Sequence, residues 1–192
     1  MSSEIIQTFY QRMMPLFKPQ AEKLLDNIDT ETLNNLAFRY TFSVEAMTKI
    51  SHIIEDAVIS TPRSADLHAS FQYLSRLSPQ QARYTTLASY ARGLWLYYES
   101  DLPKTELRSL FSHANVTGID TQGTPLVDYW LVVAYGEGVH MSLLAQEIPA
   151  MSGNERYYEG FYTFQADTAY QILAILHQIY PGSTPAPRPP EW

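Results

Sequence analysis

Hydrophobic and polar residues between positions 66 and 98 follow the pattern of a strand, a helix and a second strand. Two short apolar runs, at 66–71 and 94–98, enclose a segment whose apolar residues recur at helical spacing. Those residues are Tyr84, Leu87, Ala88 and Ala91. Because parallel strands need a crossover connection of this kind, we predict a parallel βαβ unit.

The ends of this crossover helix carry their own signals. Ser78 can act as the N-cap, Pro79 suits the first turn and Gln81 completes a capping box. Gly93 can close the helix in a left-handed conformation. The helix is therefore expected to begin at Ser78.

The C-terminal half of the chain predicts further strands. Residues 129–135 are apolar at both alternations, which is typical of a central strand covered on both faces. Residues 136–138, Gly-Glu-Gly, predict a hairpin turn. Residues 139–147 then alternate cleanly, with Ser142 among the outward positions. A short strand at 116–119 is a further candidate.

Residues 156–164 have the most unusual composition in the chain, because aromatic residues dominate a predicted strand. Gly160 within it indicates a bulge or the close approach of another backbone. Arg156 and Glu159 add one base and one acid, so this strand could line a ligand pocket. The alternative is core packing with tyrosine hydroxyl groups reaching outward.

Together these patterns predict an α/β fold, with a mixed sheet of about five strands flanked by helices. Its parts are a parallel βαβ core and an antiparallel hairpin. One flanking helix should run from after Ser43 to about Ser60, and another should stop at Pro181.

We divide the chain into three parts. Residues 1–40 are predicted to be an N-terminal helical segment, in which Pro19 restarts a helix after a first one. The segment could pack onto the main body or form a dimer surface. Residues 41–180 are the main domain. Residues 181–192, rich in proline, are predicted to be an extended, disordered tail that is either a docking peptide or a solvated end.

Composition narrows the class of function. A net charge of −7 argues against nucleic acid as a partner, since phosphate binding needs clustered lysine and arginine. The absence of cysteine excludes disulfides, thiol catalysis and thioether-linked cofactors, and it fits a reducing compartment. No apolar run is long enough for a membrane span, and the N-terminus lacks a signal-peptide pattern. We expect a cytoplasmic protein.

No common catalytic motif appears, so a protein without catalytic residues, metal or cofactor is expected. His52, Glu55 and Asp56 form the densest titratable cluster. His52 and Asp56 lie one helical turn apart and could pair, as a general base or part of a metal site. A solvated or structurally paired helix face is the simpler alternative. The five histidines show no ligand spacing on one helix.

Several stretches in this order resemble the DICT family, a sensory domain named for its occurrence with diguanylate cyclases and two-component systems. The resemblance covers residues 41–178. The stretches are Ser51–Asp56, Ala69–Gln72, Arg83–Tyr84, Leu87–Ala88, Trp130–Val133, Leu143–Glu147 and Arg156–Phe164.

The resemblance implies an α/β sensor or adaptor without catalytic activity, often in bacteria with phytochrome-like photoreceptors, cyanobacteria among them. The partner would be a sensor kinase, a diguanylate cyclase of cyclic di-GMP signalling, or a photoreceptor. A chain of 192 residues is expected to act as a stand-alone domain through protein–protein contacts. By position, the family's recurrent residues are expected to line one site near the strand ends. They are His52, Glu55, Asp56, Phe71, Gln72, Arg156 and Glu159.

Two other functions stay open from the sequence. One is an enzyme acting on a small metabolite, with His52 and either Asp56 or Glu159 as acid and base. The other is an assembly factor that self-associates through its N-terminal helices and uses the proline-rich tail.

Overall fold

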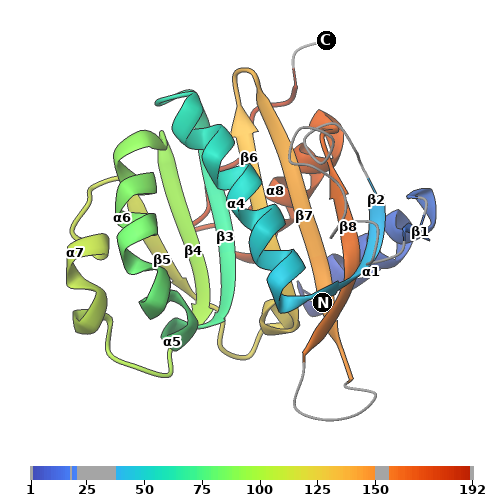
Figure 1. The fold of residues 1–192 in the computed structure, drawn as a ribbon, viewed down its shortest axis with the longest axis horizontal. Coiled ribbons are helices and arrows are strands. Elements are labelled where there is room, and N and C mark those ends of the chain that lie inside the picture. The colour runs from blue at the N-terminus through green and yellow to red at the C-terminus, as the bar shows by residue number, and fades with distance from the viewer. Residues whose placement is uncertain (1, 18, 21–37, 150–155, 191–192) are drawn as a thin grey trace.

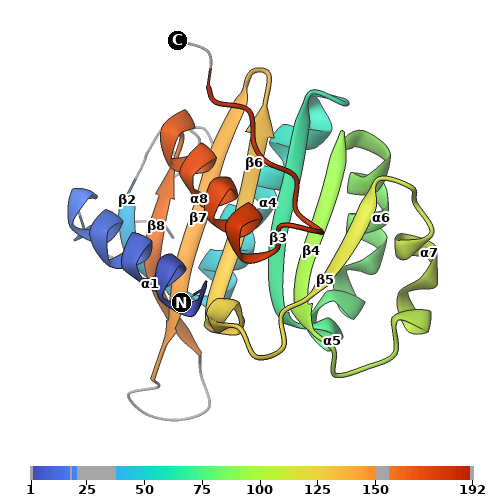
Figure 2. The same ribbon diagram turned by 180° about the vertical axis from the view of Figure 1, so that it is seen from behind.

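The computed structural model describes residues 2–17, 19–20, 38–149 and 156–190. They form three layers, with one mixed sheet between two layers of helices (Figures 1 and 2). The sheet has eight strands in the order β1-β2-β8-β7-β6-β3-β4-β5. The α/β class with a mixed sheet and flanking helices is confirmed, although the sheet has more strands than the about five that were predicted.

The predicted βαβ unit is confirmed. β3 (Ala65–Tyr73) and β4 (Gly93–Glu99) are parallel neighbours, and β5 (Val116–Asp120) lies parallel to β4. The connection from β3 to β4 consists of α5 (Leu74–Leu77), η2 (Ser78–Gln80) and α6 (Gln81–Tyr90). The next connection contains η3 (Lys104–Leu107) and α7 (Arg108–Phe111).

The predicted ends of the crossover helix were wrong. The chain turns helical at Leu74, directly after β3, so Ser78 already has helical dihedral angles and does not cap. Gly93 is the first residue of β4, and the two described glycines with positive φ lie elsewhere, at Gly123 and Gly138. The helix therefore ends through the extended conformation of Ala91.

The other half of the sheet is mainly antiparallel. β6, the predicted central strand, lies between β3 and β7 and is antiparallel to both. The predicted hairpin turn holds, with φ of 76° at Gly138. The strands on this side are β6 (Tyr129–Gly136), β7 (Val139–Ile148), β8 (Tyr157–Thr163), β2 (Phe38–Ser43) and β1 (Pro19–Gln20).

β1 and β2 correct the prediction of an all-helical N-terminal segment. Pro19, expected to restart a helix, pairs in parallel with Arg39 of β2. β2 in turn pairs with β8 along its whole length. The neighbour that makes β2 a strand is thus distant in sequence. The rest of the predicted second and third helices, at 21–37, lies outside the described residues.

Gly160 lies where the backbone of β7 approaches closely. The sequence predicted either such a close approach or a bulge at this position. A Cβ atom there would lie 2.3 Å from both the Cβ of Ala145 and the carbonyl oxygen of Leu144. The register around it is regular, with Tyr40 on one side and Ala145 on the other, so there is no bulge.

Helices cover both faces of the sheet, and each face has its own hydrophobic core. α4 (Val44–Ser60), at the predicted position, lies with α5, α6 and α7 on one face (Figure 1). α1 (Ser2–Met13), η1 (Met14–Leu16) and α8 (Ala166–Ile179) lie on the other face (Figure 2). Because both faces are covered, Ser142, predicted to point outward, is fully buried.

The apolar stripe of α1 packs within the chain. Ile6, Phe9 and Met13 are at most 6% exposed and belong to the core on the α8 side. This is the packing alternative for the N-terminal helix, and it leaves no such stripe on α1 for a partner.

The end of the chain differs from the predicted disordered tail. Residues 183–188 lie against the sheet on the α8 side (Figure 2), and Thr184 is 2% exposed. The prolines suggested disorder, because they exclude helix and strand. What holds the segment is a set of donors on distant strands, which a local pattern cannot reveal.

Candidate functional site

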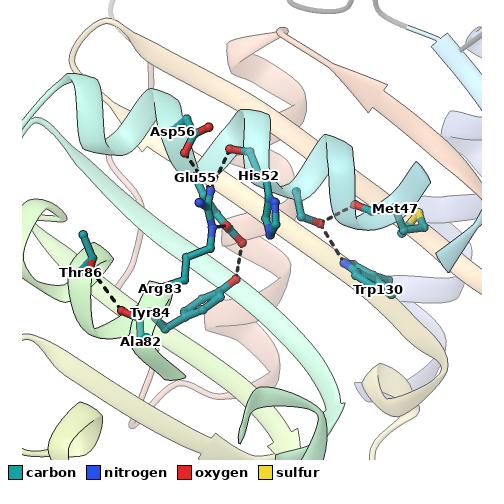
Figure 3. Close-up of polar contacts among 10 residues, drawn as sticks. Met47, His52, Glu55, Asp56, Ala82, Arg83, Tyr84, Thr86 and Trp130 are labelled. Carbon is teal, nitrogen blue, oxygen red and sulfur yellow. Dashed lines mark hydrogen bonds and ion pairs between the residues drawn. The ribbon is translucent and has the colours of Figure 1, made fainter. Parts of the chain in front are cut away.

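A buried carboxylate stands at the centre of the polar face of α4. Glu55 is 1% exposed and accepts a hydrogen bond of 2.6 Å from the hydroxyl group of Tyr84 on α6. Arg83, the preceding residue of α6, pairs with the other carboxylate oxygen of Glu55 (Figure 3). α4 and α6 are therefore joined by a buried, charge-assisted contact.

Arg83 extends this contact toward solvent. Its Nη2 donates to the carboxylate of Asp56 at 2.8 Å and to the carbonyl oxygen of His52 at 3.2 Å (Figure 3). We call these five residues, His52, Glu55, Asp56, Arg83 and Tyr84, the α4 network. Burial raises the pKa of Glu55, and the hydrogen bonds from Tyr84 and Arg83 oppose that rise.

His52 is part of this network through its backbone. Its Nε2 atom is buried and has no hydrogen-bond partner among the described residues, and Asp56 is bonded to Arg83. Glu159 is exposed on β8, next to Tyr158, and adjacent strand residues point to opposite faces. Tyr158 packs in the core on the α4 side, so Glu159 points away from His52. The acid–base pairs proposed for an enzyme are not formed.

Replacing Glu55 should show how much the α4 network contributes to stability. We expect Glu55→Leu to lower the free energy of unfolding by about 2 kcal/mol, because the Tyr84 hydroxyl is left buried without an acceptor. Glu55→Gln keeps an acceptor at the same place and should cost less than half as much. Urea unfolding of both variants provides the measurement, and equal losses would contradict this account.

The end of β3 carries a second polar group. Gln72 has φ of 57°, a left-handed conformation that is uncommon for a residue other than glycine, and it is 5% exposed. The pairing of β3 with β4 shifts register between Ser70 and Tyr73, which marks a β-bulge. Such locally strained backbone persists where the surroundings hold it, and it is frequent at functional sites.

Side chains from three elements hold the amide of Gln72. Its nitrogen donates to Glu147 of β7 at 2.8 Å, and its oxygen accepts from Tyr158 of β8 at 2.9 Å and from Arg76 of α5. Arg156 donates to the Tyr158 hydroxyl at 3.3 Å. We call Gln72, Arg76, Glu147, Arg156 and Tyr158 the β3-end cluster.

Electrostatics in the β3-end cluster favour an added negative charge. The pKa of Arg76 is lowered, first by burial and then by the positive charge of Arg156. Glu147 acts in the opposite direction, but among the described residues it is one carboxylate beside two guanidinium groups. The cluster can therefore accept a carboxylate or a phosphate group, for which arginine is well suited.

Aromatic residues connect the two groups. Phe71, beside Gln72, packs edge-on against Tyr84 with ring centroids 4.9 Å apart. Trp130 packs edge-on against Tyr158 at 5.4 Å, and its Nε1 donates to Ser51 of α4 at 3.1 Å (Figure 3). Phe71 thus links Gln72 to Tyr84 of the α4 network, and Trp130 links Tyr158 of the β3-end cluster to helix α4.

The structure thus divides the predicted site residues. His52, Glu55 and Asp56 lie in the α4 network, Gln72 and Arg156 lie in the β3-end cluster, and Phe71 lies between them. Glu159 lies in neither the α4 network nor the β3-end cluster. Arg76 was missed, although it follows Gln72 by only four residues. The stretches quoted for the family resemblance contain Arg83, Tyr84, Glu147 and Tyr158, but nothing in them shows which residues meet.

Two further observations concern the described part of the chain. None of its helices combines the length and the apolar character that crossing a membrane requires. It also contains no group of three His, Cys, Asp or Glu residues placed to hold a metal ion.

The fold and the two polar groups define a three-layer α/β domain whose charged residues are bound to one another across helices and strands. The sequence profile described as "Sensory domain in DIguanylate Cyclases and Two-component system", the DICT family, matches residues 23–148. The chain belongs to this family, and the domain is a sensory domain of signalling proteins. No curated protein and no solved structure matches the chain.

Proposed function

We propose that the domain senses its signal without catalysing a reaction, by binding an acidic group of a signalling partner or a small ligand at the β3-end cluster. The observation that carries the proposal is the pair of arginines, Arg76 and Arg156, around the strained Gln72. The family description agrees with a sensor kinase or a diguanylate cyclase as the partner. We propose as a third candidate a photoreceptor, in light-related signalling of cyanobacteria.

An acidic group would compete for contacts that already exist. Arg76 and Tyr158 are bonded to the amide of Gln72, and Glu147 is bonded to both Gln72 and Tyr158. A carboxylate or phosphate taken up by Arg76 and Arg156 would free the Gln72 amide from one donor. The left-handed conformation of Gln72 would then have less to hold it, so binding is coupled to the backbone of β3.

The packed rings give this change a route to the helices. Phe71 follows any movement of Gln72, and its ring contacts Tyr84, whose hydroxyl group is bonded to Glu55. We propose that α4 and α6 shift relative to each other as the signal output. The physical basis is a continuous chain of contacts between the two groups.

Charge reversal at the two arginines tests the proposal. We expect Arg76→Glu with Arg156→Glu to reduce recovery of the bound signalling protein at least about tenfold, because two attractive charges become repulsive. The measurement is quantitative mass spectrometry of the proteins that co-purify with the full chain from its native host.

The matched control is Arg108→Glu, a charge reversal at an exposed residue of α7. It should leave recovery unchanged. Thermal unfolding must show that the double variant is folded. A folded double variant that recovers the same partner in the same amount would refute the assignment of the β3-end cluster.

A further inference from the structure

The segment that follows α8 is bound to the sheet through its backbone. Trp95 Nε1 donates a hydrogen bond of 3.1 Å to the carbonyl oxygen of Ser183. The hydroxyl group of Tyr135 donates one of 2.7 Å to the carbonyl oxygen of Arg188. His177 Nδ1 donates to the carbonyl oxygen of Thr184 at 2.7 Å. Donors on two strands and on α8 thus bind three carbonyl groups of residues 183–188.

Burial along this segment repeats every third residue. From Thr184 to Pro190, Thr184 is buried, Pro187 and Pro190 are half-buried, and the residues between them are exposed. No residue from 185 to 190 is in a helix or a strand. A polyproline II helix has three residues per turn and no internal hydrogen bonds, so it presents every third residue to a surface and leaves its carbonyl groups free.

The surface beneath is a groove on the α8 side of the sheet. Thr184 is buried in this groove, and its hydroxyl oxygen lies 2.9 Å from the hydroxyl oxygen of Tyr97. Beyond Thr184 the segment and the sheet line a half-open cavity of about 910 Å³. Its walls include Trp95, His68 and Tyr135 from the sheet. Aromatic grooves with hydrogen-bond donors are the usual receptors of proline-rich peptides.

We infer that this groove is a docking site for an extended, proline-containing peptide segment of a partner protein, which the chain's own residues 183–190 occupy in this structure. The segment recognised has a threonine followed by prolines at the third and sixth positions after it. The inference concerns the face opposite to the β3-end cluster, so it stands independently of the function proposed above.

Two features favour exchange of the occupant, and one opposes it. The donors bind backbone carbonyl groups, which every peptide has, so side chains select only at the three inward positions. The cavity beside the prolines leaves room for larger side chains than those of this chain. A tethered segment has an effective concentration of about millimolar, so a free peptide can compete only when the tethered segment is weakened or the free one fits better.

The test uses the full chain with Pro187→Gly and Pro190→Gly, which removes the two half-buried prolines and loosens the bound segment. The probe is a fluorescent peptide with the sequence of residues 182–190, followed by fluorescence anisotropy. We expect this variant to bind the peptide at least about tenfold more tightly than the unaltered chain, because its own segment competes less.

Three variants serve as controls, and the first of them separates the loss of contact from the loss of stiffness. The chain with Pro185→Gly and Pro189→Gly loses the same number of prolines at exposed positions, so its peptide binding should stay closer to that of the unaltered chain. Adding Tyr135→Phe to the Pro187/Pro190 variant removes one donor and should weaken peptide binding several-fold. Arg108→Glu, at an exposed residue of α7 on the other face, should have no effect.

Several outcomes would overturn the inference. One is equal peptide affinity for the unaltered chain and for the Pro187/Pro190 variant. Another is no saturable binding to that variant while its thermal unfolding matches that of the unaltered chain. If the variant dimerises and excludes the peptide, the occupant is a second copy and a partner's segment is ruled out.

Should the Pro187/Pro190 variant fail to fold, Tyr135→Phe in the otherwise unaltered chain gives a second test. The backbone ¹⁵N order parameters of Ala186 and Arg188 should then fall, because the nearby anchor at the Arg188 carbonyl group is lost. Unchanged order parameters there would count against the groove.

Discussion

Gly160→Val is expected to lower the free energy of unfolding by at least about 3 kcal/mol, which is at the upper end for overpacked sites. A Cβ atom at this position would lie 2.3 Å from the Cβ of Ala145 and 2.4 Å from its Cα. These are atoms of the neighbouring strand, so they can move only if β7 and β8 separate. Valine otherwise favours strands, so intrinsic propensity predicts the opposite sign.

Urea unfolding measures this effect, with Gly182→Val as the control. A Cβ atom at Gly182 meets nothing within 4 Å, so the control should change stability by less than about 0.5 kcal/mol. If Gly160→Val unfolds at the same urea concentration as the unaltered chain, the close packing of β8 against β7 is wrong.

His68→Phe is expected to remove much of the chain's loss of stability in acid. His68 is 2% exposed, its ring is stacked on Trp95 with centroids 4.6 Å apart, and its Nδ1 lies 2.9 Å from the Tyr97 hydroxyl. Burial lowers the pKa of His68 from its ordinary value of 6.5 to about 3. The folded chain therefore keeps the imidazole neutral.

The lowered pKa sets the direction of the effect. Below pH 6.5 the unfolded chain takes up a proton at His68 that the folded chain does not, so stability is lost as the pH falls toward 3. The loss amounts to up to about 3 kcal/mol between about pH 7 and about pH 4. His68→Phe should abolish this part of the slope.

Urea unfolding at a series of pH values checks this expectation. The lost hydrogen bond to Tyr97 lowers stability at every pH, so the slope against pH is the quantity to compare. His113→Gln, at a partly exposed position on the opposite face, is the control and should keep the slope of the unaltered chain. An unchanged slope in His68→Phe would show that His68 is not buried as a neutral ring.

The sequence predicted most of the elements because their signals are local. The crossover unit at 66–98, the central strand at 129–135 and the helix after Ser43 were found from periodicity alone. The prediction failed at β1 and β2, which pair with distant or short segments, and at Ser78, where a helix had already begun. In each case the deciding neighbour lay outside the window that a pattern covers.

The candidate site shows the same division. Family resemblance pointed to Glu55, Gln72 and Arg156, and these residues do carry polar contacts. The pairing of Glu55 with Tyr84 depends on how α6 lies beside α4 on the sheet (Figure 1). The role of Arg76 depends on the bulge that turns Gln72 into a left-handed conformation. Residue spacing predicts neither how two helices pack against each other nor where a bulge occurs.

The sequence by itself determined the α/β class, the order of most elements and the kinship with a sensory family, because hydrophobic spacing and motif residues are properties of short stretches. Only the tertiary structure decided that the acidic face of α4 is closed by Arg83, that Glu159 faces away, and that the last prolines lie in a groove. The physical reason is that a polar group takes whichever partner the fold brings within about 3 Å of it, and that partner can come from any part of the chain.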